Sequence, residues 1–125
     1  MFVEFNPNPK ASRVGDCAIR AVAKALNISW EEAFVNLSIF GLMMGDLPSS
    51  NNVIGAYLRE NGFKRAVLPN SCPNCYTVRN FCEEHPKGTF ILMTNGHIVT
   101  IIDGDYFDTW DSGEEVPIFY WRKEK

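Results

Sequence analysis

The chain has 125 residues, of which 46% are hydrophobic and 22% charged, as in an ordinary globular domain that buries a core without disulfide bonds. The net charge is -3 and the basic residues form no stripe, which argues against binding nucleic acid. No segment resembles a secretory signal or a membrane span. We therefore expect one domain, residues 1–125, in the cytoplasm and without a membrane or nucleic-acid partner.

The first half of the chain predicts helices. They cover residues 16–26, 29–40 and 51–61, with an apolar loop at 41–45 between the second and the third. The first segment is rich in alanine and has its apolar residues on one face, which favours a helix. Ser29 and Glu32 form the capping box of the second helix. Cys17 falls in the first turn of the first helix.

The second half predicts strands. They cover residues 63–68, 88–94, 97–102, 105–110 and 116–121, with a short helix at 77–85 after the first. Asn95-Gly96 and Asp103-Gly104 are signals for two-residue hairpin turns. The order of elements indicates an α+β domain, in which N-terminal helices pack on a C-terminal antiparallel β-meander.

Cys17 is a candidate nucleophile. A cysteine attacks as the thiolate, and both a helix N-terminus and a nearby imidazolium stabilise that form. The chain has two histidines, His85 and His97. His97 opens a strand directly after the Asn95-Gly96 turn, where its side chain can face a cleft. We therefore expect His97 to be the base that accepts the proton of Cys17.

An aspartate is expected to orient His97. Counting back from a two-residue turn at Asp103-Gly104 places Asp108 diagonal to His97 on the same face of the hairpin. Its carboxylate could accept the second ring N–H, as the third member of a triad does. If the turn has three residues, Asp111 lies opposite His97 and takes this role instead. We favour Asp108.

These residues resemble the papain-like cysteine peptidase superfamily. The shared features are Gly15-Asp16-Cys17 leading into a helix, His97 opening a strand, and Asp108-Thr109-Trp110 on the next strand. The small size is similar to that of bacteriocin-processing peptidases and of small prophage-encoded relatives. The resemblance implies a papain-like fold, a peptide or protein substrate cleaved at a peptide or isopeptide bond, and shielding of the His–Asp pair by Trp110. No cofactor is needed for this chemistry.

The chain departs from the family near the nucleophile. The resemblance implies a glutamine about six residues before the cysteine, where it would help to bind the oxyanion, and Ala11 stands there. Asn6 or Asn8, together with the backbone N–H of Cys17, are the expected substitutes.

The other cysteines suggest a second site. Cys72, Cys75, Cys82 and His85 have the spacing C-x2-C-x6-C-x2-H, and the last two share one face of a helix. In a reducing cytosol, disulfides are rare, so these residues could complete a structural zinc site. Alternatively, Cys82 packs inward, His85 caps its helix, and Cys72 and Cys75 remain free thiols.

Three functions follow from these patterns. The first is a thiol-dependent hydrolase or acyltransferase, most simply a cysteine peptidase with a Cys17–His97–Asp108 triad. The second is a catalytically silent papain-like binding module. The third is a small zinc-stabilised interaction domain, in which Cys17 is a small packed residue and His97 bonds to a turn carbonyl.

Overall fold

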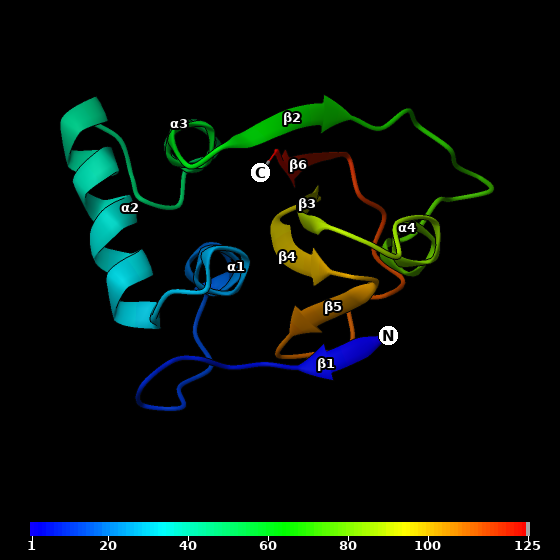
Figure 1. Ribbon diagram of the computed structural model, residues 1–125, viewed down its shortest axis with the longest axis horizontal. Helices are drawn as coiled ribbons and strands as arrows, with labels where there is room; N and C mark the ends of the chain where they lie inside the picture. Colours follow the sequence, from blue (N-terminus) through cyan, green and yellow to red (C-terminus); the bar gives the residue numbers. More distant parts are fainter. Residues whose placement is uncertain (125) are drawn as a thin grey trace.

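A computed structural model describes residues 1–124 as an α+β fold with helices on both faces of one sheet (Figure 1). The elements are β1 (Phe2–Glu4), α1 (Cys17–Leu26), α2 (Trp30–Met44), α3 (Asn51–Glu60), β2 (Phe63–Val67), α4 (Val78–Glu84), β3 (Thr89–Thr94), β4 (His97–Ile102), β5 (Asp105–Asp108) and β6 (Phe119–Lys123). The predicted α+β class is confirmed.

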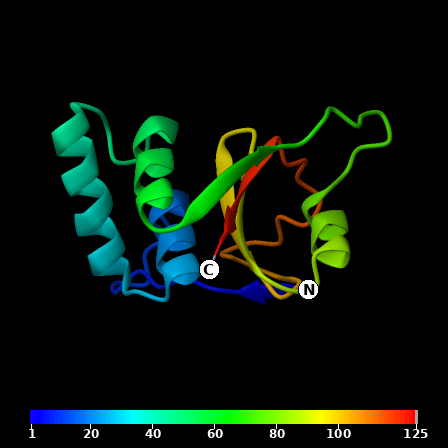
Figure 2. The same ribbon diagram turned by 45° about the horizontal axis from the view of Figure 1, so that its top comes forward.

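The sheet separates two apolar clusters. Figures 1 and 2 show α1, α2 and α3 on one side of the strands and α4 on the other. Along β3, Ile91 and Met93 contribute to the cluster beneath α1 and α3, whereas Phe90 and Leu92 contribute to the cluster beneath α4. Side chains alternate between the faces of a strand, so β3 is buried on both faces, as its unbroken apolar run requires.

The predicted meander is correct for three strands and wrong for the fourth. The sheet order is β1-β5-β4-β3-β6-β2, so β6 lies beside β3 instead of continuing beyond β5. It is antiparallel to both β3 and β2. The strand begins at Phe119 and not at the expected Val116, because Pro117 cannot donate to a ladder. β1, which was not predicted, pairs in parallel with β5.

The second helix extends past its predicted end. Residues 41–44 were expected to lie in an apolar loop, but α2 continues to Met44 and ends at Gly45, whose φ of 68° is left-handed. Gly41 lies inside the helix and is buried. A Cβ there would come within 2.7 Å of the Asp46 carbonyl oxygen. Gly41 therefore lets the chain after α2 fold back against the helix.

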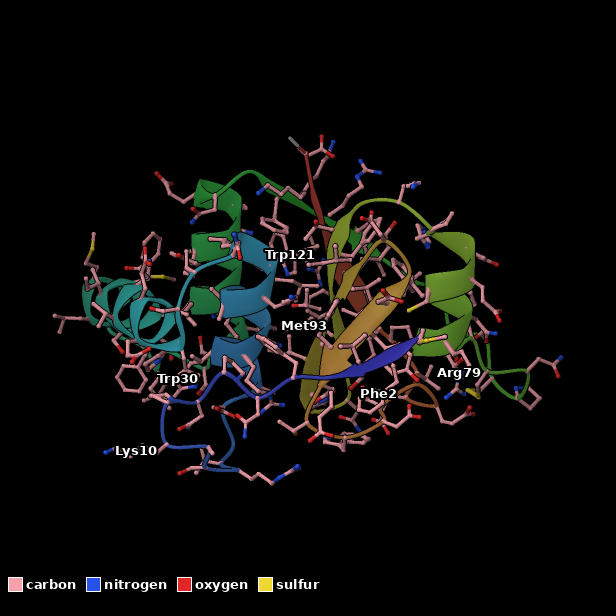
Figure 3. All side chains as sticks on the ribbon, turned by 60° about the horizontal axis from the view of Figure 1, so that its bottom comes forward. Phe2, Lys10, Trp30, Arg79, Met93 and Trp121 are labelled. Carbon is pink, nitrogen blue, oxygen red and sulfur yellow. A yellow bond between two sulfur atoms is a disulfide. The ribbon has the colours of Figure 1, made fainter. Side chains whose placement is uncertain are left out.

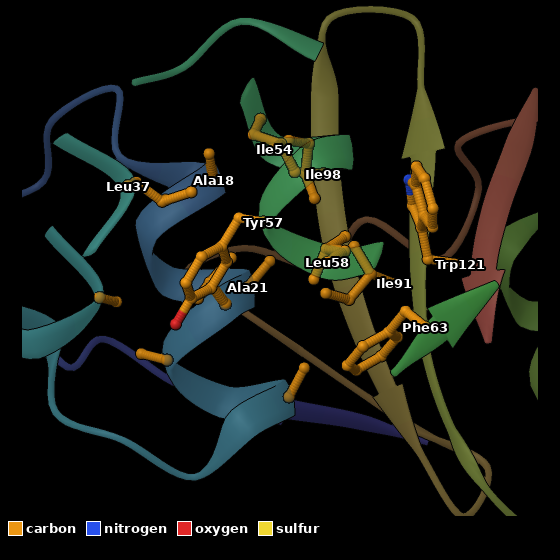
Figure 4. Close-up of a cluster of buried hydrophobic side chains, with 14 of the residues drawn as sticks. Ala18, Ala21, Leu37, Ile54, Tyr57, Leu58, Phe63, Ile91, Ile98 and Trp121 are labelled. Carbon is orange, nitrogen blue, oxygen red and sulfur yellow. The ribbon is translucent and has the colours of Figure 1, made fainter. Parts of the chain in front are cut away.

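Close packing on the sheet positions α1. Its alanines Ala18 and Ala21 lie in the cluster drawn in Figure 4, next to Ile98 of β4. The hydroxyl of Thr100 donates to the Ala21 carbonyl oxygen over 2.7 Å and is fully buried. These contacts hold α1 against β4. Within residues 1–124, no helix has the length and apolarity to cross a membrane.

Candidate active site

Cys17 is the first residue of α1 and is half-buried. The His97 side chain and the Ile98 backbone supply hydrogen-bonding groups around its sulfur. Burial by itself raises the pKa of the thiol. These hydrogen bonds, with the positive charges of His97 and Arg20, outweigh burial and lower the pKa of Cys17 below its ordinary value. The structure therefore favours the thiolate at this position.

His97 lies between Cys17 and Asp108. Its Nε2 is 2.6 Å from Oδ2 of Asp108, which leaves Nδ1 as the ring nitrogen for the bond to Cys17. Burial by itself lowers the pKa of this imidazole. The hydrogen bonds to Asp108 and Cys17 and their negative charges have the larger combined effect, and they raise it to about 9. The two shifts act in the same direction, and both favour an imidazolium beside a thiolate.

Asp108 is fixed by four donors. Oδ2 accepts from His97 and, over 2.7 Å, from the Ser112 hydroxyl. Oδ1 accepts from the Thr109 N–H at 2.8 Å and from Nη2 of Arg20 at 3.1 Å. Burial raises the pKa of this carboxyl, but the hydrogen bonds and the His97 charge lower it overall. The group is a carboxylate that cannot turn away from His97.

The two other candidates around the imidazole lie differently. The hairpin has the predicted two-residue turn, since Ile102 pairs with Asp105. Asp111 contacts the Tyr106 hydroxyl and Arg79, not His97. The ring of Trp110 is 4.9 Å from the His97 ring, centroid to centroid, and covers part of it, although Trp110 itself is 45% exposed.

A cavity of about 390 Å³ opens at Cys17 and His97. Its apolar wall includes Met93 of β3, Phe119 of β6 and Ile118, the residue before β6. Uncharged polar side chains also line it, namely Ser49, Asn51, Thr94 and Asn95. Apart from the Cys17–His97 pair, none of its lining residues is ionisable. The cavity is large enough for one or two side chains of a bound peptide.

Asn6 and Asn8 do not line this cavity. The amide nitrogen of Asn6 donates to the Ser12 carbonyl oxygen, and its Oδ1 accepts from the Asn8 N–H. Oδ1 of Asn8 accepts from the Lys10 N–H. Both side chains are thus used in the turns of the loop before α1. Asn8 instead lines a separate hollow together with Trp30. Figure 3 shows Trp30 at the end of α2 nearest the loop that carries Lys10.

The residues of the predicted zinc site do not converge. Cys72 and Cys75 form a disulfide with each other, which corrects the expectation that the cysteines are reduced. Cys82 is buried in the cluster beneath α4. The His85 ring stacks on Phe81. Within residues 1–124, no three His, Cys, Asp or Glu side chains are grouped to hold a metal ion. As they lie, these residues do not fit a four-ligand zinc site.

Two buried partners of Asp108 were not predicted from the sequence. Arg20 lies one turn after Cys17 on α1 and is 6% exposed. Ser112 follows β5 and is fully buried. The sequence does contain a signal for Arg20, because an arginine on an otherwise apolar helix face needs a buried carboxylate as its partner. The sequence contains no signal for Ser112, because this residue lies in a loop without a periodic pattern.

Comparisons with models of protein families, with curated proteins and with solved structures found no match to this chain.

Proposed function

We propose that this protein is a thiol-dependent hydrolase, a cysteine peptidase that cleaves a peptide or isopeptide bond and has a papain-like fold. The supporting observation is that Cys17 and His97 line the same cavity, while the His97 ring is hydrogen-bonded to the buried carboxylate of Asp108. An ordinary buried cysteine has no reason to sit at a helix N-terminus against an imidazole that is itself bound to a buried carboxylate.

Each residue has one task in the proposed reaction. The sulfur of Cys17 attacks the carbonyl carbon, and His97 gives a proton to the departing amine, which leaves a thioester on Cys17. His97 then removes a proton from water, which attacks the thioester and releases the acid and the free thiolate. Asp108 keeps the imidazole aligned through both steps and stabilises its charged form.

The oxyanion requires donors near the sulfur. The backbone N–H of Cys17 belongs to the first turn of α1 and has no partner within the helix. Asn51 and Asn95 carry the side-chain amides that line the cavity. We propose one of these amides, in place of Asn6 or Asn8, as the second donor.

The cavity indicates the substrate class. With an apolar wall and no ionisable lining residue besides Cys17 and His97, which face the bond to be cleaved, it suits an uncharged segment of a peptide. A peptide with an acidic or basic side chain in this cavity would lose solvation without gaining a partner. We therefore propose that residues next to the cleaved bond are apolar or small.

Covalent trapping tests the proposal. The protein is incubated with a peptidyl acyloxymethyl ketone carrying apolar residues, in parallel with a pool of fluorogenic peptides, and the adduct is located by peptide mass spectrometry. We expect one adduct, on Cys17, and turnover of at least one peptide. In His97→Ala both rates should fall about 100-fold or more.

The chain contains its own control for this experiment. Cys82 is a second free thiol, buried, and burial raises its pKa to about 11, so it should not react. Equal labelling of Cys17 in the parent protein and in His97→Ala would contradict the proposal.

A binding module without turnover is the second candidate. The placement of Asn6 and Asn8 favours it, because the side chains expected to bind the oxyanion are bonded within their own loop. The trapping experiment separates the two candidates: labelling of Cys17 without turnover of any peptide would favour the module.

A further inference from the structure

A buried ion pair lies behind the triad. Asp16 and Arg20 are 5% and 6% exposed, and their side chains form a salt bridge through Nη1 of Arg20 and Oδ1 of Asp16. The other guanidinium nitrogen, Nη2, donates to Asp108. The planar fork of the arginine thus joins the residue before the nucleophile to the carboxylate behind the histidine.

Asp16 is held from a second helix. Its Oδ2 accepts a hydrogen bond of 2.9 Å from Nε1 of Trp30, at the start of α2. Asp16 occupies the N-cap position of α1, yet its side chain makes no cap hydrogen bond. An aspartate there ordinarily bonds the free N–H groups of the first turn. Here both carboxylate oxygens face Arg20 and Trp30, so the residue serves the ion pair and not the helix end.

Charges alternate along this line of contacts. Asp16 is negative, Arg20 positive, Asp108 negative, His97 positive and Cys17 negative. Each charge is buried or half-buried and touches charges of the opposite sign. Burial of unpaired carboxylates is costly, so Arg20 compensates both Asp16 and Asp108.

We propose that the Asp16–Arg20 pair tunes the nucleophile: Arg20 positions Asp108 and stabilises the negative charge on the Cys17 sulfur, and Asp16 limits that effect by offsetting the charge of Arg20. This inference rests on the proposed function, because it assigns positioning residues to the same thiolate. Neither residue touches the reacting atoms, and each acts through Asp108 or through its charge.

Few other charges reach the sulfur. From β4 the charged neighbour of Cys17 is His97, and from α1 itself it is Arg20. β5 supplies Asp108 to the far side of the imidazole. α2 contributes the neutral indole of Trp30. The segment before α3 lines the cavity with Ser49 and Asn51, which are uncharged. Changes at Asp16 and Arg20 should therefore reach the sulfur against the background of one other ion pair, His97–Asp108.

The test uses opposite shifts from the two halves of one salt bridge. The rate of iodoacetamide labelling at Cys17 is measured from pH 4 to 9 in the parent protein, Arg20→Gln, Asp16→Asn and the double variant. Arg20→Gln should move the midpoint of labelling to higher pH and lower the rate at pH 6 about three- to ten-fold. Asp16→Asn should move the midpoint to lower pH, and the double variant should lie between the single variants.

Loss of structure alone cannot produce this result, because a merely structural pair would shift both single variants in the same direction. Arg20→Lys keeps the positive charge without the two-pronged guanidinium, so its labelling midpoint should lie between those of the parent protein and Arg20→Gln. If Arg20→Gln does not fold, as judged by near-ultraviolet circular dichroism, the labelling midpoints of Asp16→Asn and Arg20→Lys test the inference in its place. Midpoints that coincide with the parent, or that move together, would overturn the inference.

This result is separable from the proposed function. A parent protein whose Cys17 labels like an ordinary thiol, with a midpoint near pH 8.5, would contradict the thiolate–imidazolium pair itself. A parent with a low midpoint and variants that fail to diverge would contradict only the role of Asp16 and Arg20.

Discussion

At the scale of single residues, the geometry of the candidate site depends on which groups bind each of the two carboxylate oxygens of Asp108. One oxygen faces His97 and Ser112, and the other faces Arg20 and the Thr109 N–H. A carboxylate shared in this way is 1% exposed and has no freedom to rotate. It therefore fixes which ring nitrogen of His97 remains for the sulfur.

Asp108→Asn tests whether the Asp108 carboxylate stabilises the charged form of His97. The amide keeps the shape of the side chain but removes its charge, so the imidazolium loses its main stabilising partner. We expect the pKa of His97 to fall from about 9 toward its usual 6.5. Because the folded pKa is raised, the imidazolium is complete below about pH 6.5 and is lost as the pH rises through 9. In the variant this loss should occur at lower pH.

A proton NMR titration of the imidazole Cε1–H measures both proteins. The chain has two histidines, so His85→Gln assigns the resonances. Ser112→Ala is the matched control, since it removes one neutral hydrogen bond to the same carboxylate without removing its charge. A His97 resonance that titrates identically in the parent protein and in Asp108→Asn would contradict the assignment.

Much of this site follows from local sequence rules. Gly15-Asp16 before an alanine-rich segment places Cys17 in a first helical turn, and hairpin counting brings His97 and Asp108 together. Arg20 was not foreseen, because its partner lies 88 residues away. Asn6 and Asn8 were expected to bind the oxyanion only because the resemblance implies a glutamine that this chain lacks. Their side chains instead form hydrogen bonds within short Asx turns.

At the scale of elements, the helices and hairpins were predictable and the sheet order was not. Capping residues such as Ser29 and Thr77 mark helix starts within a few positions, and both accept the expected hydrogen bonds. β1 has three residues and pairs in parallel with a distant strand, so it leaves no periodic pattern. The return of β6 to β3 depends on which sheet edge is free, which no local signal encodes.

Gly41→Ala tests why α2 continues through a glycine. In an open helix this change is stabilising, because alanine is the better helix former. Here the added methyl group meets the Asp46 carbonyl oxygen, and we expect destabilisation by about 1–3 kcal/mol. Urea unfolding gives the difference. Leu42→Ala, at a neighbouring side chain that is 83% exposed, is the control and should change stability by about 0.5 kcal/mol or less. A stabilised Gly41→Ala would contradict the close packing.

At the scale of the whole molecule, the sheet keeps the candidate site apart from the disulfide. The chain between β2 and α4, which carries Cys72 and Cys75, lies on the α4 side in Figure 2, whereas Cys17 lies on α1 across the sheet. Each side has its own apolar cluster. Events in that loop should therefore leave the nucleophile undisturbed.

Replacing both cysteines tests this independence. The disulfide closes a short loop, so Cys72→Ser/Cys75→Ser should lower the free energy of unfolding by about 2 kcal/mol or less and leave the pH profile of Cys17 labelling unchanged. Metal analysis of the reduced parent protein accompanies it. We expect less than stoichiometric zinc, since Cys82 is packed in the apolar cluster beneath α4 and the His85 ring stacks on Phe81. One bound zinc per chain, lost in the double variant, would instead support the hypothesis of a zinc-stabilised interaction domain.

The position of β6 has a consequence for synthesis on the ribosome. Cys17, His97 and Asp108 all leave the ribosome before residues 119–123, and β6 is the strand that joins β2 to the rest of the sheet. Ile118 and Phe119, which wall the cavity, arrive in the same late segment. A growing chain thus exposes Cys17 and His97 while it still lacks part of the cavity wall. Formation of the cavity therefore depends on docking of β6, and not on the residues of the proposed triad alone.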